Sequence, residues 1–256
     1  MVRFTFGWSP VRSIACAVCF CLITFSNSGI AQTVFPYALS SNKELGISAP
    51  GLLFNIGGYV LAPKIKPLTP ADIAALNAGN IFPAFDRKAT RQFSLTAKKR
   101  SDQLLLSSYL IPVALALSPQ CRTMQQGRVV AVMGLETMML SNGLTQLVKN
   151  TVRRPRPFTY NPDAPASWKT EKDAQRSFFS GHTSTSASAC FFTASVFSTL
   201  YPESRWRPAV WSGAAILPLA IGYYRYKAGK HFPTDVLTGY IVGGLCGVLI
   251  PRWHRI

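Results

Sequence analysis

The chain has 256 residues, which is room for one domain with a short accessory segment but not for two independent enzymatic domains. Its 27 lysines and arginines outweigh 10 acidic residues, and the net charge of +17 predicts an anionic partner. A hydrophobic fraction of 48% and a charged fraction of only 14% argue against a nucleic-acid partner and leave anionic lipids or a phosphorylated substrate. The mean hydropathy of +0.17 is above that of most soluble domains, so membrane residence has to be judged segment by segment.

Residues 1–31 have the pattern of a secretory signal peptide. Arg3 and Arg12 precede an apolar run from about Ile14 to Phe25, and Gly29 and Ala31 are small residues at the positions that a signal peptidase reads. We expect cleavage after Ala31, which places the protein in a bacterial-type cell envelope. The alternative is an uncleaved first transmembrane helix, although the run is short for a span.

Residues 32–100 form a predicted accessory segment of mixed character. Its apolar part, Gly51–Pro63, is rich in glycine and too short to cross a bilayer, so we expect it to pack on the protein or lie at the membrane interface. Thr69 has the position of a helix N-cap, and Pro70 is the first residue of a helix that we expect to end near Gly79.

From residue 101 to residue 256 the pattern is that of apolar helices. No strand-like alternation competes with the apolar runs, and prolines and glycines separate them. We therefore predict an all-α fold, an antiparallel helical bundle of about five to six core helices embedded in a membrane. The expected helical segments are Leu104–Ser118, Val129–Val148, Thr183–Leu200, Ala209–Tyr224 and Val236–Ile250.

Polar side chains constrain how this bundle sits in a membrane. Glu136, Asn142 and Gln146 fall within one apolar run and are costly against lipid, so they should face the interior of the bundle. With an external mature N-terminus and a first span at Leu104, the arginine-bearing turns and the C-terminal tail fall inside, as the positive-inside rule prefers. The basic stretch 87–100 falls outside in this topology, against the rule, unless it lies along lipid head groups.

Three polar clusters lie at the same ends of successive helices and should converge on one face of an antiparallel bundle. Lys149–Pro157 leaves one helix, Ser180–Ser184 begins the next, and Arg225–Asp235 begins the last. The last cluster joins an arginine that suits phosphate oxygens, a histidine that can be a nucleophile or proton carrier, and an aspartate that can orient the histidine. This combination favours phosphoryl transfer, although the last cluster alone could equally be a solvated turn with a helix cap.

These clusters resemble the three-part signature of the type 2 phosphatidic acid phosphatase (PAP2) and vanadium haloperoxidase superfamily. Order and spacing both agree, over roughly residues 102 to 250. At two positions the chain departs from the pattern, because Phe179 stands where the family usually has proline and Tyr224 where it usually has serine. The three parts are Lys149-x6-Arg156-Pro157, Phe179-Ser180-Gly181-His182 and Tyr224-Arg225-x5-His231-x3-Asp235.

The resemblance implies a role for each matching residue. His231 would attack phosphorus and form a phosphohistidine, with Asp235 fixing its tautomer. His182 would protonate the leaving alkoxide and later activate water. The remaining residues would bind the phosphate through cations, a hydroxyl and the N–H groups of a helix start, with no metal and no cofactor. These phosphate-binding residues are Lys149, Arg156, Ser180, Gly181 and Arg225.

Several residues near the motifs receive no catalytic role. Arg153 and Arg154 are interpreted as solvated or as contacts to lipid head groups. His254, in the basic tail, is assigned nothing. The loop 158–176 links two parts of the site, and we expect it to contribute to substrate specificity.

Apolar helices beside a cationic site favour a phosphorylated lipid as the substrate. The sequence therefore predicts a phosphatase for lipid-linked phosphate monoesters or pyrophosphates, with its site on the extracytoplasmic side of a membrane and no obligate protein partner. Three alternatives remain: a soluble periplasmic acid phosphatase, a vanadium-dependent haloperoxidase, and a non-catalytic protein that binds anionic lipids. The last is disfavoured because lipid binding does not require His182, His231 and Asp235 at these spacings.

Overall fold

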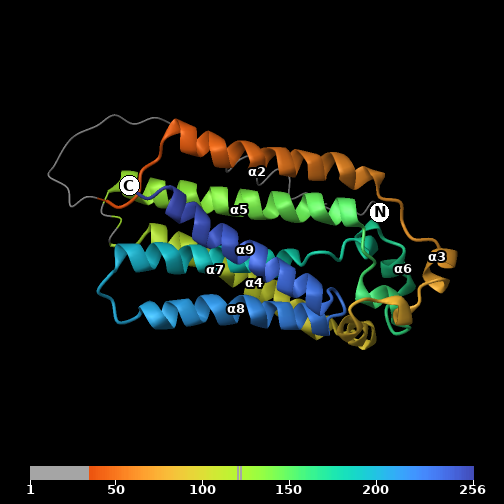
Figure 1. Cartoon of the computed structure of the whole chain (residues 1–256). Helices are drawn as coiled ribbons and strands as arrows, with labels where there is room; N and C mark the ends of the chain where they lie inside the picture. The colour runs from red at the N-terminus through yellow and green to blue at the C-terminus, as the bar shows by residue number, and fades with distance from the viewer. Residues whose placement is uncertain (1–34, 120, 122) are drawn as a thin grey trace, which may run out of the picture. The chain divides into compact units, whose positions relative to one another are not determined.

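The computed structural model describes residues 35–119, 121 and 123–256, and the signal peptide predicted at 1–31 lies outside them. Within this part of the chain, residues 36–256 form one compact unit of long α-helices without a named β-strand (Figure 1). The predicted all-α bundle of five to six core helices is confirmed. Its long helices are α2 (Ser41–Leu61), α4 (Leu95–Ala116), α5 (Met124–Val152), α7 (Gly181–Leu200), α8 (Arg207–Lys227) and α9 (Pro233–Trp253).

Helix α4 starts well before the expected first residue, Leu104. Ser94 caps the helix by accepting a hydrogen bond from the backbone N–H of Ala97, and Lys98 pairs with Asp102 at 3.0 Å one turn later. An ion pair between residues four apart stabilises a helix, so these charged residues can form the first turns of α4. The expected boundary between residues 100 and 101 falls inside α4, and the division of the chain into three segments stays a prediction.

Gly51–Pro63 packs on the protein as expected, but the expectation that it is too short to cross a membrane is wrong, because these residues belong largely to α2, a helix of 21 residues. The segment 41–64 is long and apolar enough to cross a membrane, as is α9. The glycines do not break α2 but let it approach α5: a Cβ added to Gly58 would lie 2.8 Å from the Cβ of Gln146. Close approach through glycine is the packing mode common between helices in membranes.

The connection between α2 and α4, residues 62–94, contains α3 (Pro70–Ala74). Its N-terminus matches the expectation, since the Thr69 hydroxyl accepts from the N–H of Asp72 and the Asp72 carboxylate accepts from the N–H of Thr69. The expected end at Gly79 is wrong. The helix stops after Ala74, and a separate 3-10 turn covers Ala78–Asn80.

Helices α7 and α9 pack backbone to backbone along a row of glycines in α9. Gly239, Gly243 and Gly247 are four residues apart, and a Cβ on Gly243 would clash with the carbonyl oxygen of Ser184. This close contact continues to the first turns of both helices, where the N–H of Ser180 donates to the carbonyl of Asp235 at 2.9 Å. The packing therefore fixes the start of α7 beside the start of α9.

The bundle presents apolar side chains outward and polar ones inward. On α9, Leu237, Ile241, Leu245 and Leu249 are spaced by four residues and each is at least half exposed. Apolar rows of this length are costly in water and suit lipid. Further exposed apolar side chains are Leu52, Ile56 and Val60 of α2, Leu106, Leu110 and Val113 of α4, and Ile216, Leu219 and Tyr223 of α8.

The polar residues of α5 face other helices, as expected. Glu136 is buried, and Asn142 donates to Asn55 of α2 at 3.0 Å. Gln146 accepts a hydrogen bond from Arg176, in the loop before α7. The contacts of Asn142 and Gln146 satisfy side chains that would be costly against lipid.

Candidate active site

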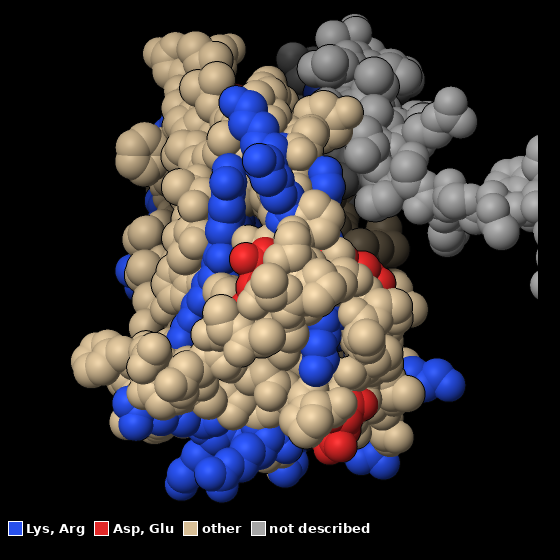
Figure 2. Space-filling view, turned by 90° about the vertical axis from the view of Figure 1, so that its right-hand side faces the viewer, with Lys and Arg blue, Asp and Glu red and all other residues tan. Residues whose placement is uncertain are grey.

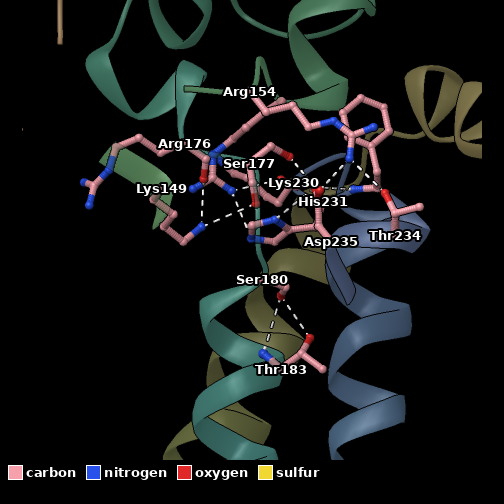
Figure 3. Close-up of polar contacts among 12 residues, drawn as sticks. Lys149, Arg154, Arg176, Ser177, Ser180, Thr183, Lys230, His231, Thr234 and Asp235 are labelled. Atoms are coloured by element: carbon pink, nitrogen blue, oxygen red, sulfur yellow. Dashed lines mark hydrogen bonds and ion pairs between the residues drawn. The ribbon is translucent and has the colours of Figure 1, made fainter. Parts of the chain in front are cut away.

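The three polar clusters meet at one end of the bundle (Figure 3). Lys149 lies in the last turn of α5, Ser180 caps α7, and His231 lies just before α9. The glycine contact between α7 and α9 brings the second cluster to the third. The first is tied to the third by Arg156, which donates to the backbone carbonyl of Lys230 at 2.9 Å.

His231 is buried, and its contacts define its tautomer. Its Nε2 lies 3.2 Å from Nη1 of Arg156. An arginine can only donate, so Nε2 is the acceptor and Nδ1 carries the hydrogen. Nδ1 faces Oδ2 of Asp235 at 3.6 Å, close for an ion pair but too long for a hydrogen bond. The lone pair of Nε2 therefore points into the cluster of cations, and Asp235 stands behind the ring.

The surroundings keep the imidazole of His231 neutral. Burial, followed by the charges of Lys149, Arg156 and Arg225, holds the pKa of His231 well below its ordinary value. A neutral imidazole is the form that can act as a nucleophile.

Asp235 is fixed by three donors of different kinds. Its carboxylate accepts from the backbone N–H of Phe232 at 2.9 Å, from the Ser177 hydroxyl at 2.5 Å and from Arg154 at 2.7 Å. This side chain is therefore rigid before any substrate is bound.

The interpretation of Arg154 as a solvated residue is wrong. Its guanidinium bridges two fully buried carboxylates, Asp235 at 2.7 Å and Asp86 at 2.8 Å. It also stacks on the Phe232 ring, 4.0 Å from the centroid. No spacing in the sequence connects Asp86 to the motifs, so the sequence does not predict this bridge. The neighbouring Arg153, which is exposed, fits its interpretation.

Arg156 is held from both sides of its guanidinium. Nε donates to the carbonyl oxygen of Asp173 at 2.8 Å, and Nη2 pairs with the Asp173 carboxylate, also at 2.8 Å. Burial raises the pKa of Asp173, but the charge and hydrogen bond of Arg156 outweigh it and hold that pKa well below the ordinary value. The expected specificity loop thus supplies a residue that orients Arg156.

Lys149 is buried with its ammonium against backbone carbonyls. Nζ donates to the carbonyl of Arg176 at 2.7 Å and lies 3.5 Å from that of Ser177. Arg176 and Ser177 belong to the loop that leads into α7. Burial, followed by the charge of Arg156, holds the pKa of Lys149 well below its ordinary value. Its side-chain nitrogen therefore has a fixed position under the loop that carries Ser180, where a bound anion would favour the ammonium.

His182 pairs with a residue that the sequence did not single out, Asp102 of α4. Nε2 of His182 lies 2.8 Å from Oδ1 of Asp102, and Nη1 of Arg225 lies 3.3 Å from the same oxygen. Because a carboxylate accepts, Nε2 of His182 donates and Nδ1 is the free nitrogen. Burial, then the charge of Arg225, lowers the pKa of His182 to about 3. The sequence offers one signal for this role of Asp102, namely that it is an isolated carboxylate just before the first apolar run.

The start of α7 offers backbone donors for an anion. The first N–H groups of a helix have no partner within the helix, so those of Gly181 and His182 are available. The Ser180 hydroxyl accepts from the N–H of Thr183 at 3.4 Å and lies 2.9 Å from the Thr183 hydroxyl. Ser180 thus acts as the N-cap of α7, and its hydroxyl can turn to a ligand only by leaving this cap.

Lys230 adds a cation that the motif did not include. Its ammonium lies 4.4 Å from the ring centroids of both Phe158 and Trp168, two aromatic residues of the loop 158–176. Burial, followed by the charge of Arg156, lowers the pKa of Lys230 to about 8. Seen from the end of the bundle that carries α3 and α6, lysine and arginine gather in a stripe and acidic side chains are few (Figure 2). The arrangement suits a compact anion such as a phosphate group.

Two comparisons with known proteins gave a match. Residues 131–256 match the family model described as the PAP2 superfamily. Among solved structures, the chain resembles a transmembrane PAP2 type phosphatidylglycerolphosphate phosphatase from Bacillus subtilis, with a TM-score of 0.51 and 21% sequence identity. That likeness covers 82% of this chain and 96% of the other and shows a shared fold. No curated protein matches the sequence.

Proposed function

Residues 131–256 belong to the PAP2 superfamily, and on this basis we propose that the protein is a phosphatase that hydrolyses lipid-linked phosphate monoesters or pyrophosphates through a phosphohistidine. The observation that carries the proposal is the setting of His231. Its Nε2 accepts from Arg156 while its other nitrogen faces Asp235, so the nucleophilic lone pair is directed at the place where cations converge.

In the first step, Nε2 of His231 attacks phosphorus, and the bond from phosphorus to the leaving oxygen breaks. The imidazole becomes positively charged, and Asp235 behind Nδ1 stabilises that charge. The leaving alkoxide takes a proton from His182. In the second step, His182 takes a proton from water, the hydroxide displaces His231 from phosphorus, and inorganic phosphate is released.

The cations stabilise the negative charge of the phosphoryl group as it is transferred. Lys149, Arg156 and Arg225 are each held by carbonyl or carboxylate oxygens, so they need little reorganisation when phosphate enters. Donors that are fixed in advance contribute most to catalysis. The proposed reaction uses no metal in this site.

His182 has to be protonated when the leaving group departs, although its pKa is lowered to about 3 before an anion binds. A bound phosphate carries negative charge, which favours the imidazolium and raises this pKa. Asp102 keeps the ring oriented through Nε2, so the proton is exchanged at Nδ1. The protonation of His182 is thereby coupled to substrate binding.

The lipid nature of the substrate is supported by the outward-facing apolar rows of α2, α4, α8 and α9, which suit a bilayer and end near the cationic site. We place the site on the extracytoplasmic side of the membrane because the arginine-bearing turns and the C-terminal tail lie at the opposite end of the bundle. Since α2 also begins at that opposite end, this placement requires the start of α2 to be cytoplasmic and not external as expected from the sequence. Cell fractionation tests this placement. Activity that is released by osmotic shock without detergent would instead support the soluble acid phosphatase.

The proposed reaction is tested by measuring inorganic phosphate released from a panel of substrates. Purified protein in detergent is supplied with phosphatidic acid, phosphatidylglycerol phosphate, a polyprenyl pyrophosphate and water-soluble phosphate esters. We expect lipid substrates to be hydrolysed with the higher kcat/KM, and the variant His231→Gln to be inactive on all of them. Equal rates for lipid and soluble esters would contradict the lipid specificity, and full activity of the variant would contradict the nucleophile.

A further inference from the structure

A second cluster of titratable groups lies at the other end of the bundle from the candidate site. His254 follows the last residue of α9, Glu44 lies in the first turn of α2, and Glu136 lies in α5. Because α9 has 21 residues, its two ends are roughly 30 Å apart. The cluster is therefore separate from the phosphate chemistry proposed above, and it joins three helices that are far apart in the sequence.

The imidazole of His254 is fully buried and presents one particular nitrogen to the carboxylates. Its Nδ1 lies 2.9 Å from the carbonyl oxygen of Ile250, so Nδ1 carries a hydrogen and donates it. Its Nε2 lies 3.1 Å from Oε1 of Glu44 and 3.2 Å from Oε2 of Glu136. A neutral ring would thus direct a lone pair at two carboxylate oxygens, which is repulsive unless a cation lies between them.

The carboxylates are under-satisfied. The side chain of Glu136 is 5% exposed, and its Oε2 has no hydrogen-bond partner; neither has the buried Oε2 of Glu44. Across the described residues, the ion pairs of both carboxylates come from His254 and not from a lysine or arginine. A buried carboxylate oxygen without a hydrogen-bond partner costs about 1–3 kcal/mol or more, which favours an additional cation here.

Charge identifies the kind of ligand. Two carboxylates and a protonated imidazole leave one uncompensated negative charge in a buried place. Two carboxylates, a neutral imidazole and a divalent cation leave none. The two distances from Nε2, 3.1 Å to Glu44 and 3.2 Å to Glu136, also fit, because ligand atoms of a tetrahedral zinc lie roughly 3.3 Å from one another at zinc–ligand bonds of about 2.0–2.2 Å.

We propose that His254, Glu44 and Glu136 bind a divalent transition metal ion of the zinc type, which ties α2, α5 and α9 together. The three ligand atoms lie within 4.8 Å of one another. The outer contacts are those of a metal site: the Nδ1–H of His254 is held by a backbone carbonyl, and the Ser48 hydroxyl donates to Oε1 of Glu136 at 2.9 Å. The ion has a structural role, since the proposed phosphatase site lies at the opposite end.

The experiment measures metal in the full-length protein, purified in detergent without chelator and without a histidine tag. Elemental analysis should find zinc or a related divalent metal at one equivalent per chain. The variants His254→Gln and Glu136→Gln should lose it. The matched control Glu203→Gln removes an exposed carboxylate from the turn between α7 and α8 and should keep it. These variants leave the proposed catalytic residues unchanged, so a soluble folded variant should still release phosphate.

A second measurement on the wild-type protein does not depend on the folding of any variant. After chelation and dialysis, Co²⁺ is added, and a tetrahedral site of nitrogen and oxygen ligands should give visible d–d absorption that saturates at one equivalent and disappears when Zn²⁺ is added. Chelation should also lower the thermal unfolding temperature, and zinc should restore it. A wild-type protein that contains no stoichiometric metal and shows no saturable Co²⁺ spectrum would overturn the proposal and indicate an imidazolium shared by two carboxylates.

Discussion

Two buried histidines, one at each end of the bundle, differ mainly in the charges around them. His231 lies among Lys149, Arg156 and Arg225, and its Nε2 accepts a hydrogen bond from an arginine. His254 lies between two carboxylates, and its Nε2 faces both of them. In each ring Nδ1 is the nitrogen that carries hydrogen.

The difference shows that the same tautomer can serve opposite purposes. Surrounding cations keep an imidazole neutral and reserve its lone pair for an electrophile such as phosphorus. Surrounding carboxylates make the same lone pair a place for a proton or a metal ion. The role of a buried histidine is therefore decided by residues that are distant in sequence, such as Arg156 for one ring and Glu44 for the other.

The largest expected difference between the two ends of the bundle comes from two single variants, His231→Gln and His254→Gln. The first removes the proposed nucleophile and should lower kcat/KM by roughly 10⁴- to 10⁶-fold, the range seen when a nucleophile or its partner is removed from an enzyme. The second should leave kcat/KM within about threefold while lowering the thermal unfolding temperature. Steady-state kinetics and thermal unfolding in the same detergent measure both; if both variants lost activity equally, the two ends would not be independent.

The second test separates neighbouring arginines at the site. Arg154→Met leaves the carboxylates of Asp86 and Asp235 buried without their cation and should destabilise the fold by about 3–5 kcal/mol. Arg153→Gly removes an exposed arginine with a backbone φ of 51°, which glycine adopts without strain, and should change stability by less than about 0.5 kcal/mol. Denaturant unfolding compares them. Equal losses would mean that the bridge between the two aspartates is unimportant.

The third test addresses Asp102, a positioning residue for His182. Asp102→Asn keeps the shape but lets the amide present either an oxygen or a nitrogen to the ring, so kcat should fall by about 10- to 100-fold, as for other residues that orient a functional histidine. The loss should be smaller for a phosphate ester with a good leaving group, which needs less protonation. A loss that is the same for good and poor leaving groups would point to a structural effect.

The smallest effect concerns Lys230 and pH. Its pKa is lowered to about 8, so the ammonium is charged below that pH and loses its charge as the pH rises through it. We expect kcat/KM to fall by about tenfold, or roughly 1.4 kcal/mol, over this rise. Lys230→Arg keeps the charge at every accessible pH and should remove the decline. A pH profile that is identical in the two proteins would assign the alkaline decline to another group.

The helical fold and the motif residues could be predicted because their signals are local. Apolar runs and their breakers marked the bundle helices, and fixed spacings marked Lys149, Ser180 and His231. The length of α2 could not be predicted by the same rule. Its glycines look like breakers in sequence, but in the fold they are contacts with α5, which only tertiary packing reveals.

The supporting residues of the site could not be predicted, because nothing in their spacing links them to the motifs. Asp86 and Asp102 lie in the region before α5, and they reach Arg154 and His182 only after the bundle has formed. His254 has no charged partner within its own segment, and its carboxylates come from α2 and α5. The residues of each motif lie close together in the sequence, whereas the residues that orient them and set their charge come close only in the folded structure.

The most direct test of the central claim is to identify the residue that becomes phosphorylated during turnover. The protein is mixed with a phosphate ester that has a good leaving group, quenched in alkali, which preserves phosphohistidine, and digested for mass spectrometry. We expect phosphate on His231, a larger amount of it in His182→Ala because hydrolysis of the intermediate is slowed, and none in His231→Gln. Phosphate found on another residue, or a variant His231→Gln that still forms the intermediate, would contradict the assignment of His231 as the nucleophile.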